Sequence, residues 1–553
     1  MLLFGGIAEA QSVPEDTAVA TPAEAPEAPA EVEQAEADTD ATNANTTNTN
    51  ATDPSTTDAN VAIDDTSTNQ RPWWSGNQPD GVARSTAAPS SQRADEPTPA
   101  ADAADSEPED EDDTRPVESG FAFGSYGRLV AASNLDGGLG RTANIVAFAP
   151  RIDEDVYMEL ELRRTDVWTG GLRSRVVATV AFGGPFFHLD GNFDESIAVR
   201  NLYAAVENAL VDGLELWAGS RMWRGDDVYL LNFWPLDNIN ALGGGATYRW
   251  DAAEDGFGLD VATVVGLTRL DDPFQRQVDG AIPIDGFLPA DVVVLDRPRT
   301  TLGLKVTGYP FGRRARTGLK FILYGEGHFI AEGTREVEVG VTERLPQDGG
   351  YVLGGQIGGW MADSNTFINL FFKWGRGLGA YNPLGVPFRE GRVQDTERAR
   401  EILIALSANY ETGPFGLQLG AYYRNFRDAD PSLFERTRLA EGVVNVRPHV
   451  WIGQRAGLSW DLSYQALQAN QLDERTGQVV RGGVTKLGFI PFYSPFGRGT
   501  YTRPHLRLIY SLTLRDADAQ RLYPEDDPRS RTKVEHFLGI GAEWWFDSSS
   551  YGQ

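Results

Sequence analysis

The chain has 553 residues, no cysteine and a formal net charge of −30 at pH 7. Without cysteine it can form neither disulfides nor thiolate sites, and it lacks the concentrated basic stretch that binding to nucleic acid requires. No run of about 18 apolar residues is present, so the sequence predicts no transmembrane helix.

The first 118 residues differ in character from the rest. Residues 1–10, MLLFGGIAEA, are similar to the end of a secretory signal peptide, with an apolar stretch and small residues at Ala8 and Ala10. Residues 11–118 are rich in Ala, Thr, Pro, Asn, Asp and Glu and carry most of the acidic excess. This composition buries too little apolar surface to offset its conformational entropy, so we predict a disordered extension. The pair Trp73-Trp74 is either a short docking motif or a chance pair in a linker.

Residues 119–553 form the predicted folded domain. From Phe121 to Phe546, runs of about ten residues alternate between apolar and polar side chains and are separated by Gly, Pro, Asp and Asn turns. In the clearest run, HLRLIYSLTLR, every even position from Leu506 to Leu514 is apolar and nearly all odd positions are polar. A strand of this length with one fully apolar face suits a membrane β-barrel, apolar toward lipid and polar toward the lumen.

The length of this domain predicts the size of the barrel. One strand with its share of turns and loops takes roughly 24 residues, so about 430 residues supply 16 to 18 strands. A barrel of that size leaves an aqueous channel. We therefore predict an all-β fold, a large antiparallel transmembrane β-barrel of about 18 strands, with 16 as the alternative.

One block in the first half of this domain carries a family resemblance. RNLYAAVENALVDGLELWAGSRMWRGDDVYLLNFWPLDNINALGGG, residues 200–245, resembles the third-loop region of the maltoporin family. Weaker anchors follow the same order along the chain: FGSYGRL, PRIDEDVYMELEL, NTFINLFFKWGRGLG, YTRPHLRLIYS and GAEWWF. Together they cover about residues 120–546, which is the whole predicted barrel and none of the acidic extension.

The resemblance implies a homotrimeric, eighteen-stranded porin in the outer membrane of a Gram-negative bacterium. Such a channel passes maltodextrin-type oligosaccharides, and its third loop folds inward to narrow the bore. Aromatic rings stack on the apolar faces of successive sugars, while charged residues exchange hydrogen bonds with the hydroxyls. In this topology the N-terminal extension lies in the periplasm, where it is a spacer or binds a periplasmic or cell-wall partner.

The same resemblance assigns candidate residues to both parts of the passage. The aromatic slide falls on Tyr126, Tyr157, Phe367, Tyr501 and Trp545, with Phe193 as the nearest candidate for the ring that a neighbouring subunit contributes. Strand alternation independently turns the first five toward the lumen, because each shares a face with a charged or polar side chain. The constriction and the polar tracks fall on Trp234, Arg128, Arg151, Glu159, Arg200, Arg224, Asn232 and Asp237.

Departures from the family pattern leave the preferred sugar open. Trp234 stands at a Tyr position, Asn232 at an Asp position and Tyr229 at a His position, and Pro235 replaces an aromatic residue. Seven residues also follow Phe546, where the terminal aromatic usually closes the chain.

Two other functional classes remain as alternatives. A general diffusion porin for small hydrophilic or ionic solutes would use the arginines of the third loop to set ionic selectivity. An enzyme is disfavoured, because no Ser–His pair stands in a recognisable motif and extended neighbours such as Asp226 and Asp227 point to opposite faces. The sequence predicts no metal site and no cofactor.

Overall fold

The computed structural model describes residues 119–548, except for 155, 184–195, 253–255, 270–275, 280–291, 339, 382–387, 390–391, 394–395, 428–437 and 473–475. The signal segment 1–10 and the extension 11–118, with its Trp73-Trp74 pair, lie outside the described residues. So does Phe193.

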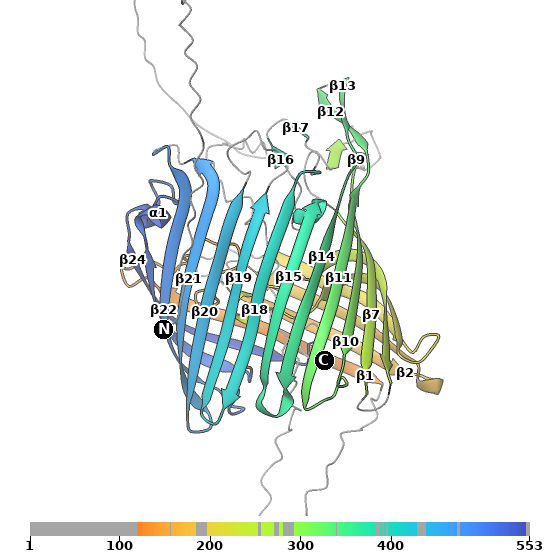
Figure 1. Cartoon of the computed structure of the whole chain (residues 1–553), viewed down its shortest axis with the longest axis horizontal. Helices are drawn as coiled ribbons and strands as arrows, with labels where there is room; N and C mark the ends of the chain where they lie inside the picture. Colours follow the sequence, from red (N-terminus) through yellow and green to blue (C-terminus); the bar gives the residue numbers. More distant parts are fainter. Residues whose placement is uncertain are drawn as a thin grey trace, which may run out of the picture. The chain divides into compact units, whose positions relative to one another are not determined.

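Eighteen antiparallel strands form one closed barrel, as the alternation predicted (Figure 1). The barrel closes where the first strand, β1, pairs with the last, β24. The strands are β1 (Gly120–Ser133), β2 (Tyr157–Val167), β3 (Arg173–Gly183), β4 (Ser196–Glu207), β5 (Leu214–Arg224), β6 (Asn238–Asp251), β7 (Gly258–Thr268), β10 (Arg299–Tyr309), β11 (Thr317–Ile330), β14 (Asp348–Met361), β15 (Thr366–Gly377), β18 (Arg400–Thr412), β19 (Phe415–Arg427), β20 (Leu439–Ile452), β21 (Ala456–Leu472), β22 (Val479–Tyr493), β23 (His505–Arg515) and β24 (Val534–Phe546).

Each strand presents an apolar face outward and a mixed polar face inward. On β18, Ile402 and Ile404 are exposed on the outside, while Glu401 and Leu403, which alternate with them, are buried inside. Lipid offers the backbone no hydrogen-bond partner, so a closed barrel with all strands paired is the only sheet that can span it. The lipid surroundings therefore account both for the outward apolar face of each strand and for the closure of the sheet into a barrel.

Short and long connections alternate from β1 to β21. The turn between β18 and β19 takes only residues 413–414, whereas β23 and β24 are separated by residues 516–533. Three small hairpins extend beyond the end that carries the long loops (Figure 1). They are β8 (Arg276–Asp279) with β9 (Val292–Asp296), β12 (Gly333–Glu338) with β13 (Val341–Leu345), and β16 (Phe388–Arg389) with β17 (Arg392–Val393).

Helical structure is confined to single turns among the described residues. They are η2 (Thr169–Gly171), η3 (Tyr229–Leu231), η4 (Ala362–Ser364), η5 (Leu378–Ala380), α1 (Ala517–Gln520) and η6 (Pro528–Ser530). None of the helices in the described part of the chain is long and apolar enough to cross a membrane.

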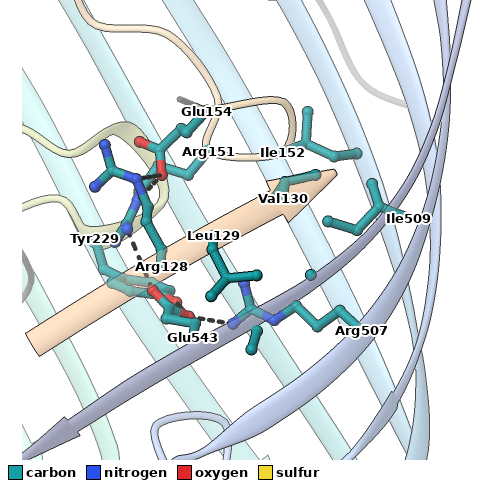
Figure 2. Close-up of a pocket in the computed structure, with 12 residues that line it drawn as sticks. Arg128, Leu129, Val130, Arg151, Ile152, Glu154, Tyr229, Arg507, Ile509 and Glu543 are labelled. Atoms are coloured by element: carbon teal, nitrogen blue, oxygen red, sulfur yellow. Dashed lines mark hydrogen bonds and ion pairs between the residues drawn. The ribbon is translucent and has the colours of Figure 1, made fainter. Parts of the chain in front are cut away.

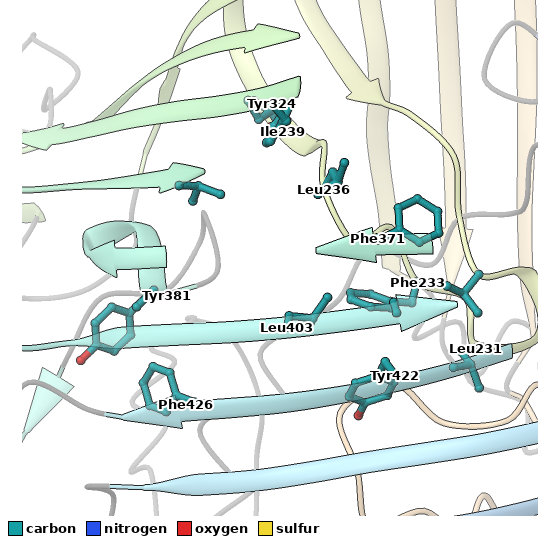
Figure 3. Close-up of a cluster of buried hydrophobic side chains, with 14 of the residues drawn as sticks. Leu231, Phe233, Leu236, Ile239, Tyr324, Phe371, Tyr381, Leu403, Tyr422 and Phe426 are labelled. Carbon is teal, nitrogen blue, oxygen red and sulfur yellow. The ribbon is translucent and has the colours of Figure 1, made fainter. Parts of the chain in front are cut away.

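The third long connection, residues 225–237 and here called loop 3, folds into the barrel as predicted. Leu231, Phe233 and Leu236 are buried there with rings from the opposite wall, including Phe371 and Tyr422 (Figure 3). Gly420 on β19 permits the approach, because a Cβ at that position would stand only 3.0 Å from Val228 Cγ1. The barrel core is thus built by a loop and the inner wall together.

The first connection, residues 134–156 and here called loop 1, also folds inward, which the sequence did not predict. Its Phe148 ring stacks on Phe233 of loop 3 with centroids 3.7 Å apart. Its backbone amides at 145 and 147 donate to Gln465 and Glu441 on the far wall, at 3.1 and 3.0 Å. Two loops therefore fill much of the lumen.

An ion pair fixes loop 1 to the wall. Lys486 Nζ on β22 lies 2.8 and 2.6 Å from the two carboxylate oxygens of Asp153. Both side chains are buried. A buried pair of this kind holds geometry firmly, because removing either partner leaves an uncompensated charge.

Candidate functional site

Rings and charges alternate on the inner wall where the barrel closes. Tyr126 on β1 stands opposite Trp545 on one neighbour and Glu159 on the other. Two residues further, Arg128 stands opposite Glu543 and Tyr157. Residues two apart on a strand share a face, so three adjacent strands present a lattice of alternating rings and charges toward the lumen.

More rings extend this lattice away from the closure. Tyr126 and Tyr157 have ring centroids 5.9 Å apart. Phe367 on β15 lies 5.9 Å from Tyr501, and Tyr501 lies 5.2 Å from Tyr229 of loop 3. The five slide candidates therefore approach one another inside the barrel, and Tyr229 lies between them.

Tyr501 lies in the lumen, but it is not on a strand as the alternation pattern had predicted. Strand β23 begins at His505, so Tyr501 and Arg503 lie in the connection before it rather than on a strand. That connection is drawn inward because Thr500 Oγ1 donates to Asn409 Oδ1 on β18 at 2.9 Å. The expected strand position of Tyr501 was wrong, although its side chain packs with the slide rings.

Loop 3 covers much of the ring surface. Tyr126 and Tyr157 keep 0 % and 4 % of their surface exposed, and they pack with Tyr229 and Leu230. Loop 1 holds that part of loop 3 in place, because the backbone amide of Arg151 donates to the carbonyl of Leu230 at 2.8 Å. Tyr501 and Trp545 are half-buried at the edge of the same cluster.

An arginine cluster surrounds two glutamates beside these rings (Figure 2). Glu543 accepts hydrogen bonds from Arg151 at 3.2 Å, from Arg503 at 2.8 Å and from Arg507. Tyr229 Oη also donates to Glu543, at 2.9 Å.

Glu154 of loop 1 forms the second centre of this cluster. It lies 2.8 Å from Arg151 Nε and 3.3 Å from Arg128 Nε. Burial alone would raise the pKa of Glu154, but Arg128 and Arg151 outweigh it and hold that pKa below its usual range. The Glu154 carboxylate therefore stays charged.

The remaining polar-track candidate on the wall, Arg200, is directed inward by a β-bulge. The register between β3 and β4 shifts at Thr179/Val180, and Arg200 and Asn201 are both buried although they are neighbours. A bulge adds one residue to a strand and re-aims its side chains. Arg200 Nε then lies 3.5 Å from Glu159 and the guanidinium faces the Tyr157 ring.

Loop 3 and the end of β5 just before it carry the predicted constriction residues. The Arg224 guanidinium lies 4.1 Å from the ring centroid of Trp234, and Arg224 Nε donates to Asn238 at 2.7 Å. Trp234 is buried, and Asn232 takes a left-handed backbone conformation at the end of η3. Arg224 thus covers one face of the indole.

Two aspartates of loop 3 fasten it to the inner wall on β10 and β11, the second and third strands beyond β6. Asp226 accepts from Lys320 on β11 at 2.6 Å, and Asp237 accepts from Lys305 on β10 at 2.5 Å. Burial raises the pKa of Asp237 despite Lys305, whereas for Asp226 the pull of Lys320 outweighs burial and lowers the pKa. Gly225 is required here, because a Cβ would lie 2.2 Å from Asp237 Oδ1.

The sequence matches a known family over the whole barrel. The model of the LamB porin family matches residues 121–546. This chain belongs to the LamB porin family. It is accordingly an outer-membrane β-barrel channel, and membership points to a porin rather than to an enzyme.

Comparison with individual proteins places this LamB porin far from each of them. No curated protein matches its sequence. Among solved structures it is similar to OccAB2 of Acinetobacter baumannii, with 13 % identity, a TM-score of 0.37 and coverage of 78 % of this chain and 98 % of that one. The outer membrane channel DcaP of the same organism shares 11 % identity, with a TM-score of 0.36 and coverage of 78 % and 99 %. OmpT of Vibrio cholerae, in trimer form, shares 11 %, with a TM-score of 0.33 and coverage of 78 % and 100 %.

Sequence reasoning about this LamB porin did not nominate several central residues. Alternation places Arg507 and Glu543 on the inner face, but it gives no sign that they and Arg503 meet across the closure. Tyr229 was noted only as a departure from the family pattern. The sequence pattern did not predict the ion pair between Lys486 and Asp153, because these residues lie 333 positions apart. Within the described ranges, no three His, Cys, Asp or Glu side chains are grouped as a metal site.

Proposed function

We propose that this porin passes maltodextrin-type oligosaccharides by facilitated diffusion along the ring-and-charge lattice. The alternation of rings and charges across β24, β1 and β2 is the observation that carries the proposal. A pyranose has an apolar CH face that packs on an aromatic ring, and its rim of hydroxyls requires donors and acceptors. Tyr126 beside Glu159, and Tyr157 beside Arg128, offer both within one sugar's reach.

The covered rings set a condition on this passage. A sugar that enters the lumen meets the half-buried Tyr501 and Trp545 first, because Tyr126 and Tyr157 lie beneath loop 3. Contact with the deeper rings requires Tyr229 and Leu230 to shift. Binding at the outer pair supplies part of the free energy for that shift, since a ligand favours the state for which its affinity is higher.

Two adjacent tryptophans on β24 provide a matched test of the slide. Trp545→Ala is expected to weaken the block of single-channel current by maltohexaose by about 10- to 100-fold, the loss typical of removing one stacking ring. Trp544 faces outward with Ile540 and Phe546 and donates to Ser125, so Trp544→Ala should leave the block unchanged. Both variants are measured as reconstituted full-length protein in planar bilayers.

The result also separates the two channel classes. If Trp545→Ala and Trp544→Ala change the block by maltohexaose equally, the proposed role of the aromatic slide is wrong. Wild-type current that ignores maltohexaose altogether would identify a general diffusion porin instead.

The proposed assembly is a homotrimer with a dispensable N-terminal extension. We expect the full-length protein and a variant lacking residues 11–118 to migrate alike as SDS-resistant, heat-modifiable trimers, because an extension of that composition contributes no apolar core. The measurement is gel migration of outer-membrane fractions with and without boiling. Loss of the trimer in the shortened protein would show that the extension takes part in assembly.

A further inference from the structure

Among the described residues, more positive than negative charge gathers around Glu543. Three guanidiniums, those of Arg151, Arg503 and Arg507, form ion pairs with this one carboxylate. Of the three, Arg151 alone has a second described carboxylate partner, Glu154. Other lumenal ion pairs on nearby strands are closer to balance, such as Lys486 with Asp153 and Arg447 with Asp461. Uncompensated guanidinium charge in a buried site favours a bound anion.

One buried nitrogen in this cluster makes no hydrogen bond to any described residue. Arg151 is 5 % exposed, and its Nε and Nη2 are engaged by Glu154, Tyr126 and Glu543. Its Nη1 is buried and makes no hydrogen bond to the described residues. A buried donor of a charged group that is left unsatisfied is costly, so the geometry leaves a place for an acceptor atom.

That place opens toward the lumen. Arg151 lines a cavity together with Arg128, Arg507, Tyr229 and the two glutamates (Figure 2). The side chains of Glu154 and Arg507 keep 19 % and 17 % of their surface exposed, so solute in the lumen can reach the cluster. The cavity adjoins Tyr126, whose hydroxyl Arg151 contacts at 2.8 Å.

We propose that this cluster is a subsite for an oxyanion, the carboxylate or phosphate of an acidic saccharide, with Arg151 and Arg507 as its recognition residues. Guanidinium groups bind carboxylate and phosphate oxygens through planar pairs of N–H donors, which suits them to this chemistry better than lysine. The subsite deepens the proposed oligosaccharide passage, on which it rests, by adding a charge preference to a lattice that otherwise recognises neutral sugars.

The test compares saccharides of equal length and different charge in planar bilayers. Trigalacturonate is expected to block wild-type current at a concentration at least about 10-fold lower than maltotriose, the scale of one charge-assisted hydrogen bond. Arg151→Gln should raise the blocking concentration of trigalacturonate by about 10- to 100-fold and should narrow the ratio between the two blocking concentrations, because only trigalacturonate brings carboxylates to the cluster. Arg507→Gln, at the exposed edge of the cluster, should also raise the blocking concentration of trigalacturonate. This second variant tests the subsite if Arg151→Gln does not fold.

A matched control removes one lumenal arginine elsewhere. Arg424 on β19 pairs with Glu401 and Glu441, in a group that Lys373 brings to balance. Arg424→Gln should therefore leave the preference for trigalacturonate in place. An equal loss in Arg424→Gln and Arg151→Gln would overturn the subsite, because it would trace the preference to the general charge of the lumen.

The remaining outcomes separate this inference from the proposed function. If wild-type current is blocked equally by maltotriose and trigalacturonate, sugar passage stands and the anionic subsite is wrong. If trigalacturonate blocks while maltotriose and maltohexaose do not, the subsite stands and the neutral-sugar function falls. Inorganic phosphate, which carries the oxyanion without a ring, is added as competitor. Relief of the block identifies a site for free oxyanions, and its absence identifies one for acidic saccharides; either result supports the subsite.

Discussion

Replacing Glu543 with glutamine is expected to lower the free energy of unfolding of the barrel by about 3–5 kcal/mol, because it leaves buried arginines without their shared carboxylate. Glu543 accepts from Arg151, Arg503 and Arg507 at the strand pairing that closes the barrel. The measurement is urea unfolding in detergent, followed by tryptophan fluorescence and by loss of the folded band on unboiled gels.

A glutamate in an exposed ion pair serves as the control for this result. Glu332 pairs with Arg344 near the β12–β13 hairpin, and the two side chains keep 63 % and 79 % of their surface exposed. Glu332→Gln should leave the free energy of unfolding nearly unchanged, because exposed pairs are screened by water. If Glu543→Gln unfolds at the same urea concentration as Glu332→Gln, the proposed role of Glu543 at the closure is wrong.

Releasing loop 1 should have the largest effect on conductance. Lys486→Met leaves Asp153 buried without its partner, which disfavours the docked loop by about 3–5 kcal/mol. A shift of that size is enough to move a two-state loop from mostly docked to substantially undocked. We expect the single-channel conductance in KCl to rise, with frequent transitions between two levels, because Phe148 and its neighbours leave the bore.

A double variant distinguishes loss of the anchor from a general defect. Lys486→Met combined with Asp153→Leu removes both charges, and a buried ion pair replaced by apolar residues is often neutral for stability. Loop 1 should then dock through its remaining contacts, such as the 3.0 Å bond from the amide of residue 147 to Glu441, and conductance should fall back toward wild type. Equal conductance in the single and double variants would show that the Asp153–Lys486 pair does not hold the loop.

The effect of Lys486→Met on conductance follows from the way two loops share the lumen. Loop 3 is tied to β10 and β11 by its aspartates, while loop 1 is tied to β22 by Asp153. The loops meet where Phe148 stacks on Phe233 and where the amide of Arg151 donates to Leu230. The passage is consequently bounded by the backbone of two anchored loops on one side and by the barrel wall on the other.

The amino-acid sequence by itself determined the barrel and the side of the wall on which most site residues lie. Alternation with a period of two is a local property, so it placed Tyr126, Tyr157, Phe367 and Trp545 on the inner face without knowledge of any distant contact. Length limited the barrel to 16 to 18 strands, the family resemblance favoured eighteen, and eighteen formed.

Only the tertiary structure decided how the lumen is filled. The inward fold of loop 1, the cover that Tyr229 places over the rings and the meeting of three arginines at Glu543 depend on partners up to 392 residues apart. At Arg200 a β-bulge interrupts the alternation of inward and outward side chains. The alternation of neighbouring residues decides which side chains of a strand face the lumen. The docking position of a loop depends instead on the buried charges and rings that it contacts. Those groups come together only when the barrel closes.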